Sequence, residues 1–141
     1  MTSFETIYKK FLPKITDYTL LQMDDETAIE FMKGWLESAV ANISDNTMKN
    51  NLTFTDTDFD ADLTETEKEV LALGMVEEWL EPQLNSVTLT KQFVGGKGEN
   101  FFAQSKQLTS LMELSDKTAK KKKKLISDYR TRHNSYLNGE S

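Results

Sequence analysis

Carboxylates recur at every second position from Asp56 to Asp62, just before the most apolar stretch of the sequence. Counted from Asp56, a twelve-residue frame has oxygen-bearing side chains at positions 1, 3, 5, 7, 9 and 12. Oxygen ligands at this density suit a hard cation such as Ca²⁺. The residues that supply them are Asp56, Asp58, Asp60, Asp62, Thr64 and Glu67. The stretch 56–67 is therefore a candidate cation-binding loop.

This frame resembles the calcium loop of EF-hand proteins, but three of its features favour a simpler interpretation. Position 6 is Ala61, where the EF-hand turn needs glycine, and a left-handed alanine costs about 1–2 kcal/mol. The preceding segment, 44–55, is a poor candidate for the helix that enters an EF-hand loop. Glu67 also stands three residues after Thr64, which is the spacing of a helix capping box. We therefore expect an acidic loop at a helix N-terminus, with no tightly bound metal and no cofactor.

The stretch from Leu63 to Leu84 predicts the central helix of the fold. Its middle is apolar nearly all round, so other helices must cover it on several sides. We expect Trp79 to be a core anchor on this helix. The dipeptide Glu81-Pro82 is expected to bend or stop it, because proline disfavours helical geometry in the residue before it.

Apolar residues at helical spacing predict further helices on both sides of the central one. They cover residues 3–12, the stretch from Asp24 or Asp25 to Ile43, residues 83–93 and the long segment from Ser105 to about Leu137. Gly34 lies inside the second of these helices, where glycine often permits a close helix contact. The predicted fold is all-α: a small bundle around a central helix, with a glycine-tipped loop and a projecting C-terminal helix. One domain spans 1–141, with a helical core at about 1–90, a loop at about 91–104 and the C-terminal helix and tail at about 105–141.

Three glycines bracketed by phenylalanines make the predicted loop a candidate contact. The pattern of a phosphate-binding P-loop is absent, because Lys97 is followed by Gly98 rather than by serine or threonine. The aromatic side chains would anchor the loop on the body of the same chain or on a neighbouring subunit. The candidate subunit or partner interface comprises Phe93, Gly95, Gly96, Gly98, Phe101 and Phe102.

Five consecutive lysines interrupt the apolar stripe of the C-terminal helix. Residues 1–99 carry 8 Lys and 19 Asp and Glu, whereas residues 100–141 carry 9 Lys and Arg and 4 Asp and Glu. Consecutive residues point all round a helix, so most of this turn must be in solvent. The lysines are either a solvated face or a site of unspecific electrostatic contact, with acidic protein surface or with phosphates. They are Lys120, Lys121, Lys122, Lys123 and Lys124.

The sequence offers little for catalysis. It has no cysteine, and its one histidine, His133, stands in a polar segment where we expect it to be exposed. Neither a nucleophile elbow nor a dinucleotide-binding glycine pattern is present. No run approaches the ~20 apolar residues of a membrane span. We expect a protein that is not an enzyme and has no membrane partner.

The run DLTETEKEVLALGMVEEWLEPQLNS, the glycine-rich loop and the run ENFFAQSKQLTSLMEL resemble the small head–tail connector, or adaptor, proteins of tailed bacteriophages. The resemblance covers roughly residues 55–135 and rests on packing patterns. It implies a mostly helical structural virion protein of the phage neck without enzymatic activity. Such proteins assemble in the host cytoplasm as a ring beneath the portal, commonly of twelve copies, and join head to tail.

The same resemblance implies the partners. These are the portal protein, a tail-side neck or stopper protein, and genomic DNA that passes through the channel without sequence-specific binding. Two alternatives from other classes stay open at this point. One is a small calcium-binding helical protein that uses the loop 56–67, and the other is a basic-tailed adaptor that binds nucleic acid.

Overall fold

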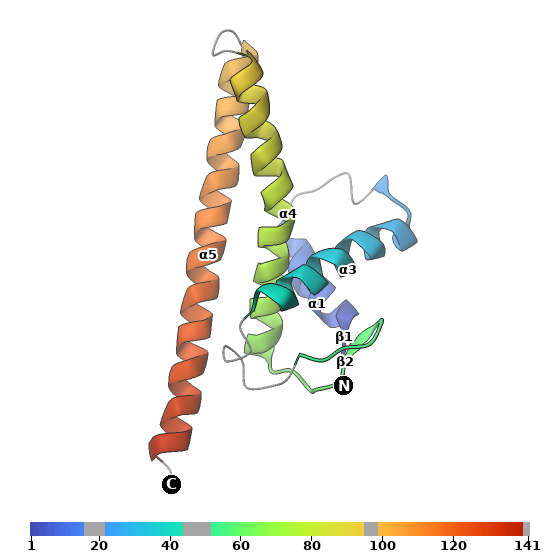
Figure 1. The fold of residues 1–141 in the computed structure, drawn as a ribbon, viewed down its shortest axis with the longest axis vertical. Helices are drawn as coiled ribbons and strands as arrows, with labels where there is room; N and C mark the ends of the chain where they lie inside the picture. Colours follow the sequence, from blue (N-terminus) through green and yellow to red (C-terminus); the bar gives the residue numbers. More distant parts are fainter. Residues whose placement is uncertain (16–21, 44–51, 95–98, 140–141) are drawn as a thin grey trace.

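The computed structural model describes residues 1–15, 22–43, 52–94 and 99–139, and most of these residues lie in α-helices (Figure 1). The predicted all-α class is confirmed at this level, apart from one short pair of strands. The elements are β1 (Thr2–Ser3), α1 (Phe4–Phe11), the 3-10 turn η1 (Leu12–Lys14), α3 (Asp25–Asn42), β2 (Asp58–Phe59), α4 (Glu65–Val94) and α5 (Glu99–Gly139).

Helix α4 is the centre of the fold, as its sequence predicts. Helix α5 runs antiparallel along one side of it, while α1 and α3 pack on the other side near its N-terminal half (Figure 1). The side chains of α4 from Val70 to Val76 are all buried, and Trp79 is only 5% exposed. Burying a large apolar side chain contributes about 1.5–3 kcal/mol, so this helix supplies much of the stability. The prediction that Trp79 anchors the core is confirmed.

The helix does not stop at Pro82. Helix α4 continues from Glu65 to Val94, so of the two predicted outcomes, a bend or a stop, the stop is wrong, and the predicted helical piece 83–93 is part of the same helix. The proline ring is exposed, and the side-chain amide of Gln83 donates a hydrogen bond of 3.1 Å to the carbonyl of Trp79 in the same turn. An interior proline costs about 3 kcal/mol. Leu84 on α4 and Leu111 on α5 both pack against the core, and this packing helps to offset that cost.

The predicted loop at 91–104 is too wide. Residues 91–94 close α4 and α5 begins at Glu99, six residues before the predicted start at Ser105. No glycine or proline stands between Glu99 and Ser105, and so nothing breaks the helix there. Four residues, 95–98, separate the two helices, and they lie outside the described residues.

Helix α3 approaches α4 at a glycine that the sequence analysis did not single out. A Cβ atom built on Gly74 would lie 2.9 Å from the Cβ atom of Ala39, whereas one built on Gly34 would meet nothing within 4 Å. Gly34 therefore permits no close contact in the described part of the chain, and the close approach of the two helices is at Gly74. Ala39 is buried, so the two backbones meet with very little side chain between them.

These two glycines provide a matched test of the helix crossing. We expect Gly74→Ala to lower the free energy of unfolding by about 1–3 kcal/mol, because an added methyl group overpacks the contact with Ala39. Gly34→Ala should raise it by about 0.5–1 kcal/mol through helix propensity alone. Urea unfolding of both variants measures the difference. If both variants gained stability equally, the close crossing of α3 and α4 would be refuted.

Candidate functional site

The capping box predicted at the start of α4 is present. The backbone N–H of Glu67 donates to the hydroxyl of Thr64 at 3.2 Å, and the N–H of Thr64 donates to Glu67 Oε1 at 2.8 Å. Sequence reasoning missed the third partner: the hydroxyl of Tyr129 on α5 donates to Glu67 Oε2 at 3.1 Å. Glu67 is 0% exposed, so its carboxylate joins the start of α4 to α5 in the interior.

Three of the other four carboxylates of the candidate cation loop have separate partners. Asp56 accepts from Lys33 at 3.2 Å, Asp58 accepts from the hydroxyl of Thr57 at 2.7 Å, and Asp62 pairs with the N-terminal ammonium group. Pairing with that ammonium group lowers the pKa of Asp62. These carboxylates therefore do not turn towards one common centre.

A small sheet holds this loop to the N-terminus of the chain. Strand β2 pairs antiparallel with β1, with Thr2 opposite Phe59, and the Phe59 side chain is fully buried at a ring-centroid distance of 5.0 Å from Phe4. Over the described residues, no group of three or more Asp, Glu, His or Cys side chains is arranged to hold a metal ion. The geometry thus gives no support to the calcium-binding alternative.

A second buried tyrosine contrasts with Tyr129. The hydroxyl of Tyr8 on α1 is buried and has no hydrogen-bond partner in the described part of the chain. Burial, with a smaller contribution from the charge of Glu37, raises the pKa of Tyr8 from 10.0 to about 12. Between pH 10.0 and about 12, the Tyr8 hydroxyl keeps its proton in the folded chain but has lost it in the unfolded chain. Stability therefore falls as the pH rises from 10.0 to about 12.

The two tyrosines allow the same substitution to be compared at a paired and an unpaired hydroxyl. We expect Tyr129→Phe to lower the free energy of unfolding by about 1–3 kcal/mol, because it removes a donor from a buried carboxylate. Tyr8→Phe should keep or raise that free energy, and it should weaken the loss of stability at alkaline pH. Denaturant unfolding at neutral and alkaline pH measures both effects. A larger loss in Tyr8→Phe than in Tyr129→Phe would contradict this account.

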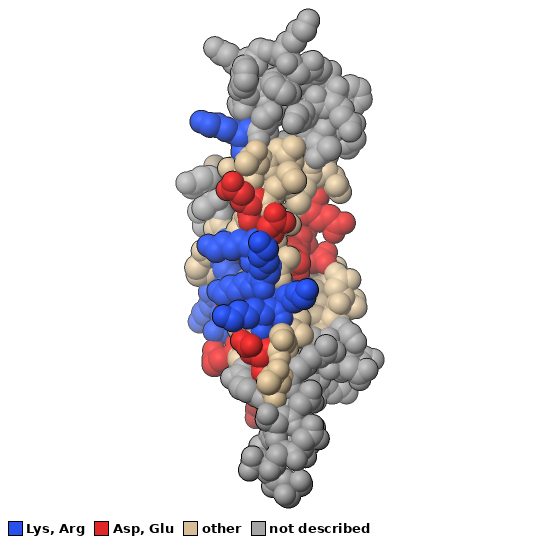
Figure 2. Space-filling model, turned by 90° about the vertical axis from the view of Figure 1, so that its left-hand side faces the viewer, with Lys and Arg blue, Asp and Glu red and all other residues tan. Residues whose placement is uncertain are grey.

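The five consecutive lysines lie on the part of α5 that packs along the acidic face of α4. Four of them are exposed, as predicted: Lys120, Lys121, Lys123 and Lys124. Figure 2 shows basic side chains gathered on this side of the molecule, with acidic side chains next to them. The side chain of the fifth lysine, Lys122, is only 19% exposed, and its Nζ atom lies 2.6 Å from Glu77 Oε1. One helical turn therefore has both a solvated and a packed side.

The neighbouring glutamates of α4 face different helices. Glu77 pairs with Lys122 on α5, whereas Glu78 accepts a hydrogen bond from the side-chain amide of Asn42 on α3. Burial, and then the nearby charge of Glu81, raises the pKa of Glu78. The ion pair of Glu77 and Lys122 thus joins the acidic part of the sequence, 1–99, to the basic part, 100–141, within one chain.

This ion pair can be tested against a neighbouring lysine. We expect Lys122→Gln to lower the free energy of unfolding by about 1 kcal/mol, because the pair is more buried than ordinary surface pairs. Lys123→Gln removes the same charge from the exposed side and should stay within about 0.5 kcal/mol of the parent chain. Thermal melts at low and high salt measure both. Equal effects of the two substitutions would show that only overall charge matters.

The predicted interface residues fall at the end of α4, at the start of α5 and in the four positions between them. Phe93 is in the last turn of α4, and Phe101 and Phe102 are in the first turn of α5, but their side chains lie outside the described set. Gly95, Gly96 and Gly98 lie outside the described residues altogether. The ends of α4 and α5 lie side by side at the end of the molecule away from the two chain termini (Figure 1). His133 belongs to α5, and its side chain is also outside the described set.

Comparisons of the chain with protein-family models, with curated proteins and with solved structures gave no match. Among the described residues, no helix combines the length and the apolarity that crossing a membrane requires. The resemblance to connector proteins therefore rests on the sequence alone.

Proposed function

We propose that this protein is a structural component of the neck of a tailed bacteriophage. In this role it forms a ring, commonly of twelve copies, beneath the portal. The ring joins head to tail, contacts the portal and a tail-side neck or stopper protein, and continues the channel for DNA. The chain acts through assembly and not through catalysis.

The observation that carries the proposal is the two-helix arm formed by α4 and α5. The span that resembles connector proteins, roughly 55–135, coincides with β2, α4 and most of α5. At 1.5 Å per residue, the 41 residues of α5 extend over about 60 Å. Such an arm offers long lateral surfaces to neighbouring subunits, while α1 and α3 add bulk on one side only (Figure 1).

Two further features agree with this role. The C-terminal end of α5 runs past the start of α4, because Tyr129 already lies opposite Glu67 and the helix continues to Gly139 (Figure 1). The other end of the arm, formed by the last turn of α4 and the first turn of α5, carries Phe93, Phe101 and Phe102. Buried aromatic side chains would supply contact energy there once a neighbour covers them.

Assembly with a portal ring tests the proposal. We expect the purified chain to form a closed ring on the cognate portal, detected by native mass measurement and negative-stain imaging. Replacing both Phe101 and Phe102 by serine should block attachment and leave the helix content unchanged. Deleting 95–98 would be a poor test, because only these residues separate two antiparallel helices.

Phe31→Ser is the matched control, since it makes the same type of substitution at a side chain that is 47% exposed and lies on α3, off the arm. It should attach like the parent chain. A parent chain that binds no portal would overturn the proposed function. Attachment that survives the double phenylalanine substitution would remove the arm tip from the interface.

A further inference from the structure

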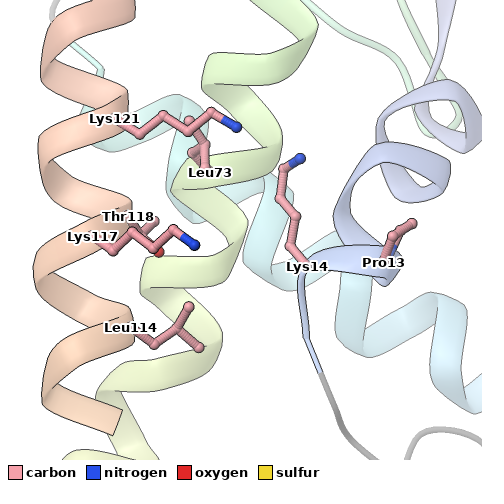
Figure 3. Close-up of a pocket in the computed structure, with 7 residues that line it drawn as sticks. All are labelled: Pro13, Lys14, Leu73, Leu114, Lys117, Thr118 and Lys121. Carbon is pink, nitrogen blue, oxygen red and sulfur yellow. The ribbon is translucent and has the colours of Figure 1, made fainter. Parts of the chain in front are cut away.

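A pocket of about 250 Å³ opens between η1 and α5 and is floored by α4. Figure 3 shows three lysines around it: Lys14 extends from η1, and Lys117 and Lys121 extend from α5. The two α5 lysines are four residues apart, so they lie on one face of that helix. The apolar walls come from Leu73 and Leu114. Residues more than 100 positions apart in the sequence thus build a single basic pocket.

One carboxylate, that of Glu69, pairs with two of these three ammonium groups. Glu69 Oε1 lies 2.6 Å from the Nζ atom of Lys14 and 3.6 Å from that of Lys121. Lys117 has no ion pair in the described part of the chain. The pocket therefore carries an excess of about two positive charges.

Two lysines near the pocket pair with glutamates outside it. Lys10 pairs with Glu65 at 2.8 Å, a carboxylate that it shares with Lys68, and Lys122 pairs with Glu77 at 2.6 Å. Bringing like charges together at a spacing of four residues destabilises a helix. A bound counter-anion would relieve that repulsion.

Partial burial strengthens the attraction for an anion. The side chains of Lys14 and Glu69 are only 22% and 21% exposed, and Leu73 and Thr118 beneath them are buried. Charges interact more strongly where water is partly excluded than they do on an open surface. Lys117 and Lys121 are themselves exposed, and they differ from the lysines at 120, 123 and 124 because the partly buried Lys14 and the apolar wall of Leu73 and Leu114 lie beside them.

We propose that this pocket binds a terminal phosphate, either inorganic phosphate or a phosphate monoester. A phosphate monoester carries about −1.5 to −2 charges at pH 7, which matches the excess positive charge of the pocket. A backbone phosphodiester carries only one negative charge and fits less well. A water occupies about 30 Å³, so the volume accommodates a phosphate with some of its hydration. Thr118 lines the pocket and adds a hydroxyl group. The site lies within one chain and does not depend on the proposed neck role.

Titration of the ¹⁵N-labelled chain with inorganic phosphate at constant ionic strength tests the site. We expect saturable shifts of the backbone amides of Lys14 and of residues 114–121, and a higher melting temperature by mass action. Lys117→Gln should weaken the phosphate affinity about tenfold, because it removes a charged donor. Lys117 is exposed, so the variant should fold like the parent chain.

Lys123→Gln is the control, because it removes the same charge from an exposed position outside the pocket. It should change the phosphate affinity less than twofold. Equal weakening in both variants, or shifts that never saturate in the parent chain, would overturn the proposal. The proposal would also be overturned if an oligonucleotide that lacks a terminal phosphate bound with the same affinity as inorganic phosphate. A nucleoside monophosphate that binds more tightly than inorganic phosphate would identify an ester as the source of the group.

Discussion

The structure depends on the burial of a helix that is apolar nearly all round. No single neighbour can cover the middle of α4, so α1, α3 and α5 each have to cover one side of it. The N-terminal helices α1 and α3 and the C-terminal helix α5 are therefore parts of one core, although they lie at opposite ends of the sequence. Gly74 sets how closely α3 approaches, because only a residue without a side chain leaves room for Ala39.

The buried carboxylate of Glu67 adds a polar constraint to this apolar core. It accepts from the backbone of Thr64 and from the hydroxyl of Tyr129. Leaving a buried carboxylate without its donors costs more free energy than an ordinary hydrogen bond contributes. A shift of α5 by one turn would remove one of those donors. Glu67 thereby fixes the register of α5 along α4, even though the apolar stripe of α5 is thin and broken by lysines.

Local signals in the sequence predicted much of the fold. The spacing of Thr64 and Glu67 predicted the start of α4, and helical periodicity predicted α1 and α3 nearly to the residue. The sequence left open whether Pro82 bends or stops α4, because the outcome depends on the side chain of Gln83 and on packing with α5. The sequence also drew attention to lysines 120–124, which are consecutive. It gave no sign of a pocket shared by Lys14 and Lys117, because that proximity exists only after η1 and α5 have packed on α4.

The folded chain changes the meaning of the charge asymmetry between the two parts of the sequence. Lys122 pairs with Glu77 of α4 in the same chain, so part of the basic segment is already neutralised, whereas Lys121 shares Glu69 with Lys14. The exposed lysines at 120, 123 and 124 remain for contacts with other molecules. Surface charges of this kind are screened over about 8–10 Å at physiological salt and contribute little singly. In the proposed ring, electrostatic attraction would therefore orient neighbouring subunits, and the energy that holds them together would have to come from apolar contacts along the arm or at its tip.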